Sequence, residues 1–205
     1  MNAQSKPGPV DFDLSRGRVE RRASADSAKA KGGHDDQVVL VPLSALAGLE
    51  KIAGHEATKQ FARAIGVPLG RRVAARLGSA NGVAAASLDA FVSALATELA
   101  VSGWGVLHLE RWGKAMVLVV EHTPSLPAAA FAALLEGAVE AAAAREVHAV
   151  ALVSGAGDNA ATSTRVLIAS EKTAQQAQRW LIEGMSESDV IRKLHDAAKS
   201  TGGAA

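Results

Sequence analysis

Four apolar runs with strand character occur as two adjacent pairs, and this grouping limits the folds open to the chain more than any other feature. The first pair surrounds Trp112, Gly113 and Lys114. The second pair, "VHAVALV" and "TRVLIAS", surrounds a turn rich in Gly, Asp and Asn. Two strands joined by a short link pair antiparallel, because parallel neighbours need a long crossover. The sequence therefore predicts two β-hairpins.

Helical patterns lie before, between and after these hairpins. Ser87 is expected to cap a helix that ends at Gly103. The segment between the hairpins predicts a helix whose inward residues are Phe131, Leu134, Leu135, Ala138 and Val139. Two more helices close the chain, the second with a capping-box-like start at Ser186 and Asp189. The predicted class is α+β, an antiparallel four-stranded sheet with helices packed on it.

The first helical segment has its own apolar periodicity. Pro68 is expected to end or kink it. Its apolar positions recur every three or four residues, which predicts an inward face made of Leu46, Leu49, Ala53, Ala57, Phe61 and Ala64.

Composition divides the chain into three parts. Residues 1–37 are rich in Ser, Gly, Pro and charged residues, so we expect a disordered, partly basic tail. Residues 38–198 form the predicted α+β domain, and residues 199–205 a flexible C-terminal tail. The basic part of the N-terminal tail is a predicted partner-binding element, carried by Arg16, Arg18, Arg21 and Arg22.

Charge and cysteine content exclude several classes of protein. The 22 Lys and Arg nearly balance the 21 Asp and Glu, so nothing in the charge demands nucleic acid or an acidic membrane. The chain has no cysteine, which rules out disulfides, thiolate zinc sites and a cysteine nucleophile. No apolar run reaches the roughly 18 residues of a membrane span, and the N-terminus lacks the apolar region of a secretory signal. We expect a cytoplasmic protein.

The residues offer no clear catalytic or metal site. The turn with "GAGDN" runs into a strand, whereas a phosphate-binding loop runs into a helix, so a hairpin turn is expected. Ser154 lacks the spacing of a hydrolase nucleophile. His108, Glu110 and His122 could lie together across the first hairpin, where such a cluster is geometrically possible. The alternative is that they belong to the solvated face or edge of the sheet. We predict no catalytic residue, no metal ligand and no cofactor.

The three tryptophans are the candidate ligand or interface residues. Trp104 lies where a helix passes to a strand, between two glycines. Trp112 lies in a hairpin turn, where a large aromatic is exposed unless a partner or its own domain covers it. Trp180 lies on a helix beside Leu181, as core or interface.

The chain resembles the 4-vinyl-reductase domain family, which is related to the small α+β subunits of the TRAPP vesicle-tethering complex. The resemblance covers roughly residues 46–194 and rests on "GVPLGRRVAARLG", "SGWGVLHLE" and "VALVSGAGDNAATSTRVLIAS". It implies a usually dimeric α+β domain with an apolar cavity for a small molecule, used in sensing, regulation or assembly. Family members often carry metal-binding cysteines near the last hairpin; this chain has Ser154, Thr162 and Ser163 there.

These observations lead to a non-enzymatic homodimer as the first hypothesis. It would act as a regulatory or scaffolding adaptor, with the N-terminal tail binding an unidentified protein partner. The alternative is a sensor that holds an apolar small molecule in its cavity. A nucleic-acid binder using the basic tail ranks last, because acidic residues flank that stretch.

Overall fold

The computed structural model describes residues 10–13, 18–21, 38–39, 43–112, 115–123, 126–152 and 163–201, with side chains for 48–111, 116–123, 126–152 and 163–196. The chain divides into two units, Met1–Leu46 and Ala47–Ala205, which are described separately.

The first unit contains a small antiparallel sheet of β1 (Val10–Asp13), β2 (Arg18–Arg21) and β3 (Val38–Val39). Apolar and acidic residues alternate along β1, which is the period of a strand, and Asp13 lies opposite Arg18. The disordered, partly basic tail expected for residues 1–37 stays a prediction. The other positions of that segment lie outside the described residues, so its binding role stays a prediction.

The second unit is built on a four-stranded antiparallel sheet, as predicted. The hairpins are β4 (Val106–Trp112) with β5 (Ala115–Glu121), and β6 (His148–Leu152) with β7 (Ser163–Ala169). The strand order is β4-β5-β7-β6, because β5 pairs with β7. The shorter strand β6 therefore forms one edge of the sheet.

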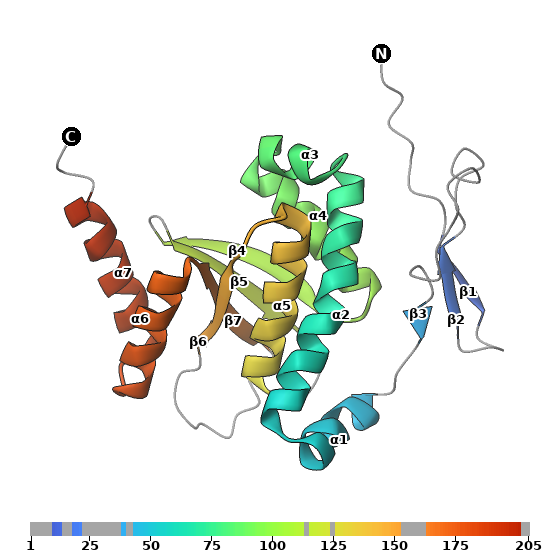
Figure 1. The fold of residues 1–205 in the computed structure, drawn as a ribbon, viewed down its shortest axis with the longest axis horizontal. Helices are drawn as coiled ribbons and strands as arrows, with labels where there is room; N and C mark the ends of the chain where they lie inside the picture. The colour runs from blue at the N-terminus through green and yellow to red at the C-terminus, as the bar shows by residue number, and fades with distance from the viewer. Residues whose placement is uncertain are drawn as a thin grey trace. The chain divides into compact units, whose positions relative to one another are not determined.

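Helices cover both faces of this sheet (Figure 1). Alternate residues of β5 and β7 point to opposite faces, so both faces need cover. One face packs against the C-terminal helices, with Val117, Val150 and Leu167 in contact with Ala174 and Ile191. The helices are α1 (Leu43–Ala53), α2 (His55–Arg76), α3 (Ala80–Ala85), α4 (Leu88–Val101), α5 (Ala128–Ala143), α6 (Glu171–Ile182) and α7 (Glu187–Thr201).

The predicted caps of α4 and α7 and the predicted inward face of α5 are confirmed. The Ser87 hydroxyl accepts a hydrogen bond from the Ala90 amide at 3.1 Å. The Ser186 hydroxyl accepts one from the Asp189 amide at 3.2 Å. The inward residues predicted for α5 are all buried. Ser170 occupies the N-cap position of α6, but its hydroxyl contacts the Thr173 hydroxyl and not a backbone amide.

Helix α2 departs from the sequence prediction in two ways. The helix does not end at Pro68 but continues through it to Arg76, with buried residues on both sides of the proline. Gly54, at φ +82°, separates α2 from α1, so the predicted single helix is two.

The predicted inward face of α2 is wrong as well. Ala57 and Ala64 are exposed, and Phe61 is 42% exposed. The buried positions are Thr58, Ala62, Gly66, Leu69, Gly70 and Val73. The reason is the close approach of α5: a methyl group on Gly66 would lie 2.0 Å from the Leu134 carbonyl oxygen. Only the smallest residues permit that contact, so burial follows small size and not apolar bulk.

A buried carboxylate joins α2 to α4. Glu98 is fully buried and accepts hydrogen bonds from Arg72 Nε at 2.8 Å and Arg76 Nη2 at 2.9 Å. Both arginines are partly exposed, which lets the charged group be paired without taking the whole network out of water.

Candidate functional site

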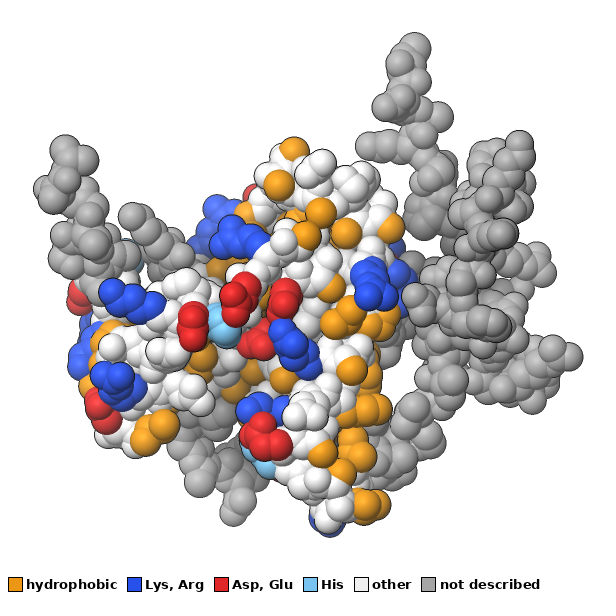
Figure 2. Space-filling view, in the orientation of Figure 1, with side chains coloured by type: hydrophobic (Ala, Val, Ile, Leu, Met, Phe, Trp, Pro, Cys, Tyr) orange, Lys and Arg blue, Asp and Glu red, His pale blue; other side chains and the backbone are white. Residues whose placement is uncertain are grey.

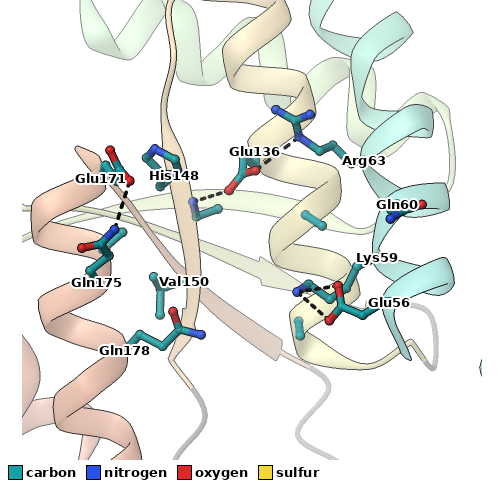
Figure 3. Close-up of a pocket in the computed structure, with 14 residues that line it drawn as sticks. Glu56, Lys59, Gln60, Arg63, Glu136, His148, Val150, Glu171, Gln175 and Gln178 are labelled. Atoms are coloured by element: carbon teal, nitrogen blue, oxygen red, sulfur yellow. Dashed lines mark hydrogen bonds and ion pairs between the residues drawn. The ribbon is translucent and has the colours of Figure 1, made fainter. Parts of the chain in front are cut away.

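A cleft of about 340 Å³ opens between α2, α5, α6 and the edge strand β6. Figure 3 shows the side chains of α2 and α5 on one side of β6 and those of α6 on the other. Its apolar lining is small, provided by Ala129, Ala133, Val150 and Ala174. Charged and amide side chains make up the rest of the wall. A volume of this size lies at the lower end of small-molecule sites.

Glu136 of α5 holds the edge strand in place. One of its carboxylate oxygens accepts a hydrogen bond from the Ala149 amide at 2.9 Å, and the other lies 3.3 Å from Arg63 Nε on α2. The Ala149 amide belongs to the outer side of an edge strand, where no further strand pairs with it among the described residues. The carboxylate therefore satisfies a backbone donor and links three elements at the floor of the cleft.

His148, the first residue of β6, brings an unsatisfied ring nitrogen to the same place. Its Nε2 atom is buried and has no hydrogen-bond partner among the described residues. The Glu146 carboxylate is 3.6 Å from this atom, which is an ion-pair distance and too long for a hydrogen bond. A buried polar atom left unpaired costs free energy that a bound molecule could recover.

The α6 wall presents a polar stripe with one residue per turn. Glu171, Gln175 and Gln178 recur at helical spacing and line the cleft, while Ala174 and Ala177 lie beneath them. Glu171 accepts a hydrogen bond from the Gln175 amide at 3.0 Å. On the opposite wall, Lys59 pairs with Glu56 at 3.2 Å (Figure 3). The cleft thus offers donors and acceptors on two walls.

The arrangement is suited to binding. Glu136 is engaged by a backbone amide and by Arg63, and the lining described here contains no hydroxyl or thiol nucleophile. Within the described residues, no group of three or more His, Asp or Glu side chains is arranged to hold a metal ion. A second, shallower groove of about 370 Å³ lies on the other side of Arg63, along α2 and α5.

Of the three tryptophan candidates, Trp104 and Trp180 do not line this cleft. Trp104 is buried and meets Phe131 of α5 edge to face, with ring centroids 6.4 Å apart. Trp180 packs against the core on the other face of the sheet, with Lys193 Nζ 5.2 Å from its ring centroid. Trp112 ends β4, and its side chain lies outside the described residues.

The other sequence candidates are placed only in part. His108 Nε2 lies 3.5 Å from the Glu121 carboxylate, and both side chains are about half exposed, as on a solvated sheet face. The Gly- and Asp-rich turn, residues 153–162, lies outside the described residues, and so do Arg16 and Arg22. Arg18 and Arg21 lie in β2, without described side chains.

Comparisons with known proteins show the fold class. No family model matches the chain, and no curated protein matches it. Among solved structures, the phenol-responsive sensory domain of the transcription activator PoxR, crystallised with phenol, is similar to it, with a TM-score of 0.53 and 12% identity. The match covers 78% of this chain and 84% of that domain. The two share an α+β fold.

None of the helices that the structure describes is long and apolar enough to cross a membrane.

Proposed function

We propose that this chain is a small-molecule-responsive regulatory domain whose ligand binds in the cleft between α2, α5, β6 and α6. The observation that carries the proposal is the buried Nε2 of His148 at the floor of that cleft, which has no hydrogen-bond partner among the described residues. The shared fold supports it, because the similar solved domain is a phenol-responsive sensor.

The cleft favours a ligand that is polar on one side. Ala133, Val150 and Ala174 offer a small apolar surface, and His148 offers a hydrogen-bonding nitrogen beside it. A small aromatic molecule with a hydroxyl or carboxylate group satisfies both features. This ligand is more polar than the apolar molecule that the sequence suggested.

Binding there would join parts of the domain that otherwise touch mainly through the sheet. The ligand would contact α6 on one wall and α5 on the other, with β6 between them (Figure 3). A ligand shifts an equilibrium only by its differential affinity for the two states. A state with α6 drawn toward α5 would be the state it stabilises, and a partner protein could recognise that state. The proposal includes no catalytic step.

The test compares two histidine variants. Phenol and 4-hydroxybenzoate are titrated into the full chain and into the His148→Ala and His108→Ala variants, with binding followed by calorimetry. His108 is the control, because its side chain is half exposed on β4 and does not line the cleft. We expect His148→Ala to weaken binding at least tenfold and His108→Ala to leave it unchanged. Equal affinity in both variants, or no binding of either probe at millimolar concentration, contradicts the proposal.

The adaptor function, with the basic tail as its binding element, stays a second proposal. Its support is the run of arginines between residues 16 and 22, since guanidinium groups form bidentate hydrogen bonds with carboxylates. The vinyl-reductase-like character of the domain also stays a proposal, and it is compatible with either function. A pull-down with Arg16, Arg18, Arg21 and Arg22 changed to Ala tests the tail. Unchanged partner recovery would reject the tail as a binding element.

A further inference from the structure

The charged side chains that line the cleft are mostly acidic. The lining contains three carboxylates, Glu56, Glu136 and Glu171, and two cations, Lys59 and Arg63. Both cations are already engaged, because Lys59 pairs with Glu56 at 3.2 Å and Arg63 Nε lies 3.3 Å from Glu136. Arg63 also pairs through Nη2 with a carboxylate outside the lining. Figure 2 shows the resulting excess of acidic side chains around a histidine on this face, over β6 and α5.

Glu171 is the carboxylate of the lining that has no cationic partner among the described residues. It is the first residue of α6, and its Oε1 atom accepts a hydrogen bond from Gln175 Nε2 at 3.0 Å. The donor is a neutral amide, so the carboxylate keeps its full negative charge. A positively charged group on a ligand would give this carboxylate the partner that the chain does not supply there.

The fold brings Glu171 close to His148. Strands β6 and β7 pair with His148 opposite Ala169, and Glu171 follows Ala169 by two residues. Figure 3 shows both side chains at the same end of the cleft that they line. The Glu146 carboxylate, 3.6 Å from His148 Nε2, adds a second negative charge there. Carboxylates only accept hydrogen bonds, and a neutral histidine with its hydrogen on Nδ1 accepts at Nε2, so this end of the cleft suits a ligand that donates.

We propose that the cleft selects a small organic cation, an aromatic amine whose ammonium group pairs with Glu171. This inference rests on the proposed function and narrows the class of ligand that it leaves open. The ammonium group donates a charge-assisted hydrogen bond to the carboxylate, and a hydroxyl on the same ligand still donates to His148. A carboxylate ligand would instead lie beside Glu171 and Glu146, and this juxtaposition of like charges opposes its binding.

The first test compares three probes by calorimetry on the full chain. Tyramine, 4-ethylphenol and 3-(4-hydroxyphenyl)propionate share a phenol ring and a two-carbon chain, and they are positive, neutral and negative at neutral pH. We expect tyramine to bind about tenfold more tightly than 4-ethylphenol, and the propionate to bind more weakly than 4-ethylphenol. Equal affinities, or tighter binding of the propionate, overturn this inference and leave the proposed function standing. No binding of any probe at millimolar concentration overturns both.

The second test assigns the charge preference to Glu171. Glu171→Gln removes the charge and keeps an oxygen that can accept from Gln175. Glu183→Gln is the matched control, because Glu183 is exposed at the other end of α6 and does not line the cleft. We expect Glu171→Gln to lower the affinity for tyramine about tenfold and to leave that for 4-ethylphenol unchanged, which also shows that the variant is folded. Wild-type affinity for tyramine in Glu171→Gln, or an equal loss for both probes or in both variants, overturns the inference.

Discussion

The contact between α2 and α5 makes a strong prediction, because backbone touches backbone there. A methyl group on Gly66 would lie 2.0 Å from the Leu134 carbonyl oxygen and 2.9 Å from the Ala138 amide nitrogen. A methyl group on Gly70 would lie 2.0 Å from the Ala138 carbonyl oxygen. Neither neighbour is a flexible side chain that could turn away. Gly66→Ala must therefore push the two helices apart by about 1.4 Å to restore an ordinary carbon–oxygen contact.

Two opposing effects set the magnitude. Alanine in place of glycine within a helix ordinarily stabilises by about 1 kcal/mol. Overpacking a tight contact costs about 1–3 kcal/mol, and the upper end applies at Gly66 because backbone has to move. The net expectation is a loss of about 2 kcal/mol in the free energy of unfolding. For a chain of this size, that loss lowers the melting temperature by about 4–8 °C.

The matched control is Gly48→Ala. Gly48 lies in α1, and a methyl group there would meet nothing within 4 Å. The control variant keeps the gain in helix propensity without the clash, so its melting temperature should equal or exceed that of the wild type. Urea unfolding and calorimetry measure both variants. If Gly66→Ala is as stable as Gly48→Ala, the close approach of α2 and α5 is refuted.

The other predictions concern two carboxylates. Glu98→Gln removes the charge of a fully buried carboxylate and should cost about 3 kcal/mol of unfolding free energy. Glu140→Gln changes a partly exposed ion pair and should cost less than about 1 kcal/mol. Equal losses in urea unfolding would contradict the role given to Glu98. The hydrogen bond from the Ser186 hydroxyl and the charge of Arg192 lower the pKa of Asp189. The ionised Asp189 carboxylate therefore stabilises the folded state at pH values above the ordinary carboxyl pKa. This contribution is lost as the pH falls through the lower pKa of the folded state. Melting curves should place Asp189→Asn below the wild type at pH 7 and level with it near pH 2, and an equal gap at both pH values would argue against the cap.

The sheet could be predicted from local pattern because its pairing is local. Each hairpin joins neighbours in the sequence, so the alternation of apolar residues and the short link at Trp112 were enough to predict the strands. The inward face of α5 was predicted for a similar reason, because its large side chains, such as Phe131 and Leu134, all point to one core.

Helix α2 could not be predicted by the same rule. Periodicity assigns the bulkier apolar face to the interior, but the contact with α5 selects Gly66 and Gly70, and it leaves Phe61 outside. Two faces of one helix can look alike in sequence, and nothing in the local pattern says which face packs against the rest of the chain. The run of small residues in α2, spaced by four, was the available signal for the buried side.

The cleft was missed because its parts come from distant segments. Glu136, His148 and Gln175 lie on three elements, and none belongs to a short motif. The position of β6 at the sheet edge decides which side chains meet there, and that position follows from the pairing of β5 with β7. The tryptophans were chosen as candidates because of their size. Trp104 instead packs against Phe131 of α5, and Trp180 packs against the core between the sheet and the C-terminal helices.

The central claim is that a ligand bound in the cleft engages the His148 ring. Its most direct test is an NMR spectrum of the ¹⁵N-labelled imidazole nitrogens of the full chain, recorded while phenol and 4-hydroxybenzoate are added. Since Nε2 of His148 is buried without a hydrogen-bond partner among the described residues, a ligand hydroxyl or carboxylate at hydrogen-bond distance must change its nitrogen shift. The account predicts a saturable shift at His148 and none at His108. A ligand that saturates the protein while the His148 nitrogens keep their shifts would contradict it.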